Sequence, residues 1–368
     1  MWTWALRSII AERGTMAASL SGIAMAFVVA LSLDAIFAGE TLGIIAYPTH
    51  AEADVWVMQE GVANMHMASS LIHADRAEDV QDVAGVSSVT PILYLNTFVR
   101  AGGEDWFSYV VGLPPQAERG GPWEVTAGSG APEPGGVILS EVVAHKAGVE
   151  LGDRVSIGEL DLAVTGLSGG TFSMANTITW VALQDLREHM SAPRSTSYLL
   201  VEVDGDADPA EVTGAIMASR SDLHAMTAAA FVASDRRMAM HMGADVVQLM
   251  TVIGTALAAM VLAFTIYAAT LRRGRELAVA KALGAPDSRL VLAVLFQSVI
   301  LGAGGWLVAL AMFAVGAPLL DQLVPDVSLV LQLSAVTRLA AASAVVIVLA
   351  TLAPALRVLR TDPALAFS

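Results

Sequence analysis

The chain has 368 residues, of which 55% are hydrophobic and 15% are charged, and it contains no cysteine. A hydrophobic share above the usual 45–50% or so excludes an ordinary soluble enzyme and predicts an integral membrane protein. The net charge of −15 argues against nucleic acid as a partner, and the lack of cysteine excludes disulfides and thiol chemistry.

The first residues, MWTWALRSIIAERG, place apolar side chains at helical spacing beside Trp2 and Trp4. This predicts a cytoplasmic interfacial helix at residues 1–14, followed by a first transmembrane helix at 15–38. A secretory signal is the alternative. Against it, the apolar run exceeds the roughly 7–15 residues of a signal core, and Asp34 lies near its far end.

Residues 39–243 are predicted to form an extracytoplasmic domain of α+β class, large enough for its own core. They carry 27 Asp and Glu against 10 Lys and Arg, a net charge of −17. The negative charge of the chain therefore belongs to this domain. It keeps the domain soluble and favours cationic partners.

The domain reads as two similar halves, residues 50–115 and 196–228, around an inserted subdomain at 127–195. Each half alternates strand-like and helix-like runs. In the first half we expect strands at 53–59, 88–101 and 105–113 and a helix from Asp75 to Gly85; in the second, strands at 197–203 and 223–227 with a helix opening at Asp208. The insertion begins with the linker AGSGAPEPGG and contains a helix at 140–148.

From Ala228 onward the chain lacks proline up to Leu271, which predicts one helix about 65 Å long. Its first part, 228–245, would form a stalk, and 246–271 the second transmembrane helix. Further spans are predicted at 290–314 and 333–356. Outside residues 38–243, nine of the ten Lys and Arg residues lie on one side when the chain crosses four times. Both termini, including the tail 357–368, and the loop 272–289 are therefore predicted to be cytoplasmic.

Several segments near the end of the chain resemble the FtsX-like permease domain of ABC transporters such as MacB, LolC, LolE and DevC. The segment LRRGRELAVAKALGAPDSRL (271–290) resembles the family's Arg-Arg-x-x-Glu run and Ala-Leu-Gly-Ala turn. The spaced glycines Gly302, Gly304 and Gly305 and the ending PALRVLRTDPALAFS are similar to the family as well. Upstream, GVILSEVVAHKAGVELGDRVSI has a looser likeness. Gln297 departs from the family, where many members carry Glu: a neutral amide keeps the hydrogen bonding but loses the charge.

The resemblance implies an α-helical membrane protein with four spans, and a MacB-like domain of two subdomains between spans 1 and 2. It implies a coupling helix at 272–289 that docks on a cytoplasmic ABC ATPase through Arg272, Arg273, Arg275, Glu276, Lys281, Leu283, Gly284 and Ala285. The alternative is that these arginines only anchor a helix end at lipid headgroups. The glycines are expected in helix packing, and the small residues of spans one to three are expected to hold a dimer.

The chain has no GxxxxGK[ST] phosphate loop and only two lysines. We therefore expect no enzymatic activity and no cofactor in this chain, with ATP and Mg²⁺ bound by a separate ATPase. The resemblance implies a second permease chain, identical or not, and a bacterial inner-membrane location.

The expected function is mechanotransmission: ATP hydrolysis drives extracytoplasmic export or extraction of a lipid, lipoprotein or peptide. The alternative is an FtsX-like scaffold that activates a cell-wall hydrolase. An adaptor, lipoprotein or hydrolase would then be the outer partner. The Met- and His-rich segments 64–73 and 236–243 offer soft ligands for copper, and the turn DGDAD offers carboxylates for calcium, but the lack of cysteine and the ordinary use of such residues in helix contacts and turns favour neither metal.

Overall fold

The computed structural model describes residues 13–66, 69–272, 274–323 and 329–359. The chain divides into two compact units. One holds residues 39–244, and the other holds the helices that flank them in sequence. The predicted interfacial helix lies almost wholly outside the described residues, and so does most of the tail; both remain predictions.

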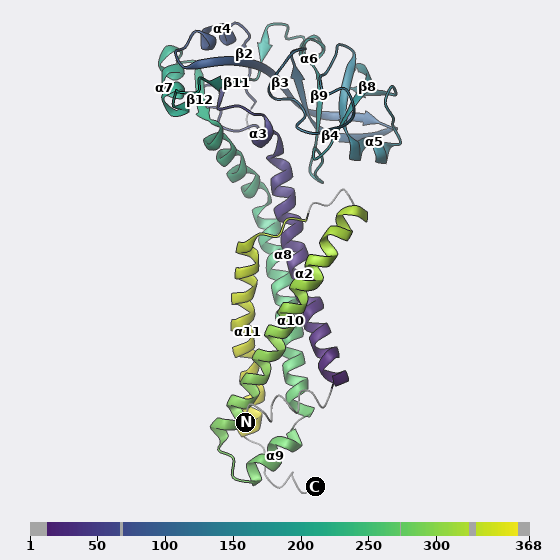
Figure 1. Ribbon diagram of the computed structural model, residues 1–368, viewed down its shortest axis with the longest axis vertical. Coiled ribbons are helices and arrows are strands. Elements are labelled where there is room, and N and C mark those ends of the chain that lie inside the picture. Colours follow the sequence, from purple (N-terminus) through teal and green to yellow (C-terminus); the bar gives the residue numbers. More distant parts are fainter. Residues whose placement is uncertain (1–12, 67–68, 273, 324–328, 360–368) are drawn as a thin grey trace. The chain divides into compact units, whose positions relative to one another are not determined.

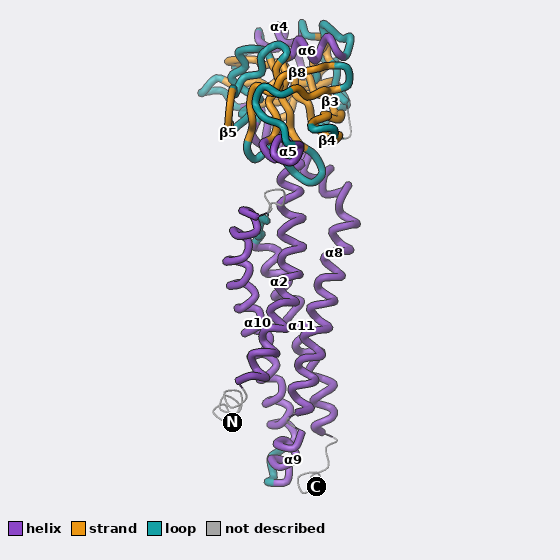
Figure 2. Tube along the Cα trace, turned by 90° about the vertical axis from the view of Figure 1, so that its right-hand side faces the viewer, coloured by secondary structure: helices purple, strands orange, loops and turns teal. Residues whose placement is uncertain are grey.

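The helical unit is built from long helices that lie side by side (Figures 1 and 2). The long helices are α2 (Arg13–Ile44), α8 (Ala228–Arg272), α10 (Asp287–Leu323) and α11 (Leu333–Leu359). Residues 39–44 of α2 and 228–244 of α8 belong to the other unit. A short helix, α9 (Gly274–Ala282), follows α8 in the chain. Three of the long helices contain stretches long and apolar enough to cross a membrane: Ala17–Ile44, Val252–Arg272 and Asp287–Leu320. A shorter apolar stretch, Leu333–Leu349, lies in α11.

The core of the helical unit joins α2, α8, α10 and α11. Ile23 and Phe27 of α2 pack with Leu262 of α8, Leu301 of α10 and Ile347 of α11. Phe27 also meets Trp306 edge to face, with ring centroids 4.9 Å apart. Large side chains on one helix thus fill the space left by alanine and glycine on its neighbours, the usual means of packing helices closely in a membrane.

The other unit is a mixed β-sheet with short helices on it (Figure 1). Its strands are β1 (Val55–Gln59), β3 (Val86–Ala101), β4 (Glu104–Leu113), β5 (Val125–Gly128), β6 (Gly136–Ser140), β7 (Arg154–Ile157), β8 (Leu160–Ser168), β9 (Thr177–Ala182), β11 (Tyr198–Val203) and β12 (Leu223–Thr227), with a separate pair β2 (Ile72–His73) and β10 (Ser195–Thr196). The helices are α3 (Ala46–His50), α4 (Arg76–Gln81), α5 (Glu141–Ala147), α6 (Leu183–His189) and α7 (Pro209–Ser219).

The strands follow the order β12-β1-β11-β3-β4-β9-β6-β8-β5, and β7 pairs with β3 and β8. Pairing is antiparallel except between β4 and β9 and between β6 and β8. The long hairpin β3–β4 joins the strands of the two predicted halves to those of the predicted insertion. The insertion is therefore not a separate sheet, because β9 continues hydrogen bonding from β4.

Side chains alternate between the two faces of the sheet, and on β1, β6, β9 and β11 both faces are largely buried. On β1, Val55 and Val57 face a core beneath α4 and α7, whereas Trp56 and Met58 face an aromatic core on the other side. A third core lies beneath α5 and α6. Burial on both faces explains why these strands read as continuous apolar runs.

Most predicted elements are found within a few residues of the predicted bounds, and α8 is a single helix as expected. The segment 272–289 differs from the prediction. It is not one helix: α9 ends at Ala282, and α10 begins at Asp287. The strand β9 and the helix α6 were not anticipated.

Candidate functional site

The candidate site is the connection between α8 and α10, where the predicted docking residues lie. Arg272 ends α8 with an exposed side chain. Arg273 lies outside the described residues, and the side chains of Arg275 and Glu276 are not described. The basic part of the predicted surface is therefore only partly visible, and its role remains a prediction.

The end of α9 has a tightly defined backbone. The Gly284 amide donates to the Lys281 carbonyl at 3.0 Å, and the Ala285 amide donates to the Ala280 carbonyl at 3.1 Å. Gly284 has φ +88°, a left-handed conformation that glycine adopts without strain. This pair of bonds is the Schellman motif, which satisfies the last carbonyls of a helix.

The turn is fixed by packing and by an ion pair as well. Ala280 and Ala285 pack against Leu290 and Val294 at the start of α10. The Lys281 ammonium lies 3.1 Å from the Asp287 carboxylate. Lys281 is therefore engaged within the chain, and Asp287 is a residue of this site that the sequence reasoning missed.

Two apolar side chains point outward from the same connection. Val279 is 41% exposed and Leu283 is 84% exposed. They are four residues apart, so they lie on one face of the helix, one turn apart. Ala278 is fully buried, which places the opposite face of α9 against its own chain. The site thus presents an apolar pair beside a basic helix end.

The predicted packing glycines lie against other helices of the same chain. A Cβ atom added at Gly302 would lie 2.3 Å from Ile347 Cδ1, and one at Gly305 would lie 2.4 Å from Ile23 Cγ2. At Gly304 the nearest atom would be Leu20 Cδ2 at 3.1 Å. Gly302 therefore faces α11, and Gly305 faces α2, of the same chain; that small residues of spans one to three hold a dimer remains a prediction.

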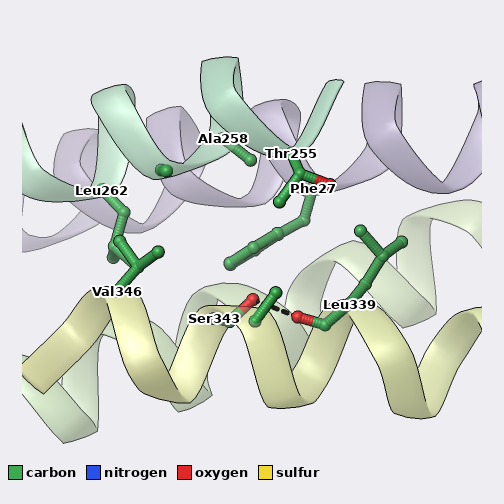
Figure 3. A pocket seen from close by; sticks show the side chains of 9 residues that line it. Phe27, Thr255, Ala258, Leu262, Leu339, Ser343 and Val346 are labelled. Carbon is green, nitrogen blue, oxygen red and sulfur yellow. Dashed lines mark hydrogen bonds between the residues drawn. The ribbon is translucent and has the colours of Figure 1, made fainter. Parts of the chain in front are cut away.

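A pocket lies within the helical unit between α2, α8 and α11, with about 220 Å³ of empty space including its open mouth. Its polar side chains are Thr255 and Ser343, and the Ser343 hydroxyl donates to the Leu339 carbonyl in its own helix at 2.6 Å. The pocket is otherwise apolar and contains no charged side chain. Its labelled lining residues are Phe27, Thr255, Ala258, Leu262, Leu339, Ser343 and Val346 (Figure 3).

Two histidines of the Met- and His-rich segments each pair with an aspartate. His66 pairs with Asp235 and His73 with Asp75, at 2.9 and 3.1 Å. Among the described residues no group of three or more His, Asp or Glu side chains is placed to hold a metal ion. Asp208 of the DGDAD turn accepts a hydrogen bond from the Ala210 amide at 2.9 Å and so caps α7.

Comparisons with known proteins cover nearly the whole chain. Residues 16–219 match the model of the MacB-like periplasmic core domain, and residues 249–363 match that of the FtsX-like permease C-terminal domain. The chain belongs to the FtsX-like permease family of ABC transporters. The membrane location of this permease follows from that assignment and from its apolar helices.

The relatives agree with the family assignment. Uncharacterized ABC transporter permeases of Mycobacterium bovis and Mycobacterium tuberculosis are 26% identical over 322 residues, which is 85% of this permease and 84% of theirs. Among solved structures, the periplasmic region of MacB from Actinobacillus actinomycetemcomitans matches with a TM-score of 0.39 and 13% identity, covering 49% of this chain and 90% of that one. The extracellular domain of the noncanonic transporter YknZ from Gram-positive bacteria matches with a TM-score of 0.37 and 13% identity, covering 48% of this chain and 99% of that one.

The family assignment also indicates which component of the transporter hydrolyses ATP. Permeases are the membrane components of ABC transporters and are not themselves the enzymes, so the assignment implies a cytoplasmic ATPase as a partner of this permease.

Proposed function

We propose that this permease works by mechanotransmission. ATP binding and hydrolysis on the separate ATPase, which holds the ATP and Mg²⁺, move α9; the movement passes along α8 to the domain 39–243. The cargo, a lipid, lipoprotein or peptide, is handled by that domain outside the cytoplasm and does not pass between the spans.

The observation that carries the proposal is the surface of α9. Val279 and Leu283 expose apolar area beside the basic end of α8, on a short helix held firmly at its far end by the Gly284 turn. An exposed apolar pair on a rigid element is what a groove on a partner protein binds, and nearby charges steer the encounter. Anchoring to lipid headgroups explains the arginines but not the outward-facing leucine.

The length of α8 supports the second half of the proposal. It is assigned as one helix of 45 residues, about 68 Å at 1.5 Å per residue. No proline interrupts it, and proline is the usual cause of a sharp kink. A continuous helix passes a tilt or shift along its length with little loss.

The membrane topology that the proposal needs has four spans. In this arrangement α11 supplies the fourth span, and both termini and α9 face the cytoplasm of a bacterial cell. The positive-inside distribution of Lys and Arg supports this orientation. Because the chain lacks cysteine, single cysteines introduced at Leu283 and at Phe98 test it directly: a membrane-impermeant thiol reagent should label intact cells or spheroplasts at Phe98→Cys and not at Leu283→Cys.

The functional unit is proposed to contain two permease chains, each bound to one ATPase subunit. Exposed apolar side chains on α8, such as Met260 and Phe264 at 70% each, provide area for lipid or for a second chain. Cross-linking of single cysteines at these two positions distinguishes the two, since only a second chain gives a covalent dimer.

The decisive experiment is co-purification of the permease with the ABC ATPase with which it is co-expressed. The triple substitution Arg272→Ala, Arg273→Ala and Glu276→Ala should remove the ATPase while the permease remains folded in the membrane. If the wild-type permease never binds an ATPase, the proposal fails. If it binds an ATPase whose activity is unaffected by lipid, lipoprotein or peptide cargo while a cell-wall hydrolase is held outside, the permease is a signalling scaffold instead.

A further inference from the structure

The first turns of α8 carry one buried stripe within the unit 39–244. Phe231 and Asp235 are fully buried and Ala239 is 5% exposed. These residues are four apart, so they lie on one face of the helix. Arg236, next to Asp235, is exposed. The buried stripe attaches the start of α8 to the sheet.

Phe231 makes the apolar part of this attachment. Its ring stacks on Trp56 of β1, with centroids 4.5 Å apart and an angle of 14° between the planes. It also meets Tyr198 of β11 at 6.0 Å, edge to face. These aromatic contacts anchor the first turn of α8 on the sheet.

Asp235 makes the polar part, and its contacts reach a different segment. One carboxylate oxygen, Oδ1, accepts a hydrogen bond from the Met65 amide and lies within hydrogen-bonding distance of His66 Nδ1, both at 2.9 Å. The side chain of His66 is only 4% exposed. The second oxygen of Asp235 and His66 Nε2 are both buried, without a partner in the described part of the chain.

Stability alone does not explain an aspartate at this position. Burying a carboxylate is unfavourable unless all its hydrogen-bonding capacity is used, and an apolar side chain of similar size is often as stable or more so. Here half of that capacity is unused. What Asp235 does achieve is to tie one turn of α8 to the backbone and side chain of the 61–66 segment.

The contacts continue from His66 to an exposed surface. The His66 ring lies 5.3 Å from that of Tyr109 on β4. Tyr109 meets Phe107 at 5.9 Å, and Phe107 meets its cross-strand partner Phe98 at 5.5 Å. Phe98 is 56% exposed and Phe107 38%. A chain of touching side chains thus leads from α8 to an open aromatic face on the hairpin β3–β4.

We propose that Asp235 is the positioning residue that couples α8 to the 61–66 segment and, through His66, to the aromatic face of Phe98 and Phe107. When α8 shifts, the hydrogen bond to Met65 and the contact with His66 carry this segment with it. This inference rests on the proposed mechanotransmission and names where the movement enters the domain. Touching residues do not by themselves establish coupling, so the test measures the response on each side of Asp235 separately.

The test uses hydrogen–deuterium exchange of the full-length permease, bound to its ATPase in nanodiscs, with and without ATP and vanadate. The variants are Asp235→Leu, which fills the site without polar atoms, and Asp235→Asn, which retains an oxygen for Met65. The matched control is Arg236→Gln, on the neighbouring exposed position. We expect exchange at the Met65 amide to rise about 10- to 100-fold in Asp235→Leu, because a hydrogen bond to a charged acceptor is lost.

The nucleotide response then separates the outcomes. In the wild type and in Arg236→Gln, nucleotide should alter exchange in α8, in residues 61–66 and in the β3–β4 hairpin. In Asp235→Leu the response of α8 should persist while the other two are lost, with Asp235→Asn intermediate. An unchanged response of residues 61–66 in Asp235→Leu overturns the role of Asp235 but leaves the proposed function standing. No nucleotide response anywhere in the wild type rejects the proposed function itself. If Asp235→Leu does not fold, His66→Leu leaves the Met65 hydrogen bond in place and should keep the nucleotide response of residues 61–66 while removing that of the β3–β4 hairpin; an unchanged hairpin response would overturn the route through His66.

Discussion

Replacing Leu283 by alanine tests the docking surface without disturbing the fold. Leu283 is 84% exposed, so its truncation should change the free energy of unfolding by no more than about 0.5 kcal/mol. If the side chain enters an apolar groove on the ATPase, its loss removes the burial of a leucine, worth about 1.5–3 kcal/mol. The affinity for the ATPase should therefore fall by about 10- to 150-fold.

The assay is the equilibrium affinity of the purified ATPase for the permease in nanodiscs. The matched control is Leu323→Ala, because Leu323 is 79% exposed and ends α10 at the far end from α9. It should leave the affinity unchanged. An unaltered affinity for Leu283→Ala, or equal weakening by both substitutions, would contradict the assignment of the α9 surface as the docking site.

Three further predictions concern stability. Gly305→Ala should destabilise the permease by about 1–3 kcal/mol, because the added methyl group overpacks against Ile23. Gly316 in the same helix has open space around it, so the control Gly316→Ala should be neutral or stabilising. Thermal unfolding in detergent compares the two variants, and adding Ile23→Ala should partly restore the stability of Gly305→Ala. The Arg338 guanidinium lies 2.6 and 2.9 Å from the two oxygens of Asp34. Asp34→Arg and Arg338→Asp should therefore each lower the unfolding temperature, and the double substitution should recover most of the loss. Additive losses would show that the two residues are not coupled. Burial raises the pKa of four of the five tyrosines, Tyr47, Tyr94, Tyr109 and Tyr198, and so favours their neutral form in the folded state. The free energy of unfolding should therefore fall as pH rises above about 10, and the phenolate absorbance of these four residues should rise only with unfolding. Ionisation of more than one tyrosine before unfolding would contradict their burial.

Local patterns made most elements of this fold predictable. The second half of the sheet unit shows why: Asp208 and Pro209 are a strong helix start, and α7 begins at Pro209 with Asp208 as its cap. The strand expected at 223–227 has those bounds. At the α9 corner, glycine after the leucine indicated a tight turn, and its left-handed φ gives the reason.

A strand and a helix boundary that have no clear signal in the local sequence were missed. The strand Thr177–Ala182 is buried at every position, so it shows no alternation of polar and apolar residues by which to recognise it. The break between α9 and α10 was missed because Asp287 and Arg289 read as part of a basic loop, whereas Asp287 begins α10 and pairs with Lys281.

Contacts between residues far apart in the chain could not be predicted from a single sequence. His66 and Asp235 are 169 positions apart, and Asp34 and Arg338 are 304 apart. Nothing in the local composition at either end indicates its partner. These are tertiary pairings, and they became visible only once the fold placed α8 against the 61–66 segment and α11 against α2.

The central claim is that nucleotide on the ATPase moves the domain 39–243 through α8. The most direct measurement is the distance between spin labels at Phe98→Cys and Leu307→Cys of α10 in the cysteine-free chain, taken with the ATPase in its nucleotide-free and ATP-bound states. Both positions are exposed, one in each unit. Mechanotransmission predicts two different distance distributions. The same distribution in both states, in a permease whose ATPase is active, would contradict it.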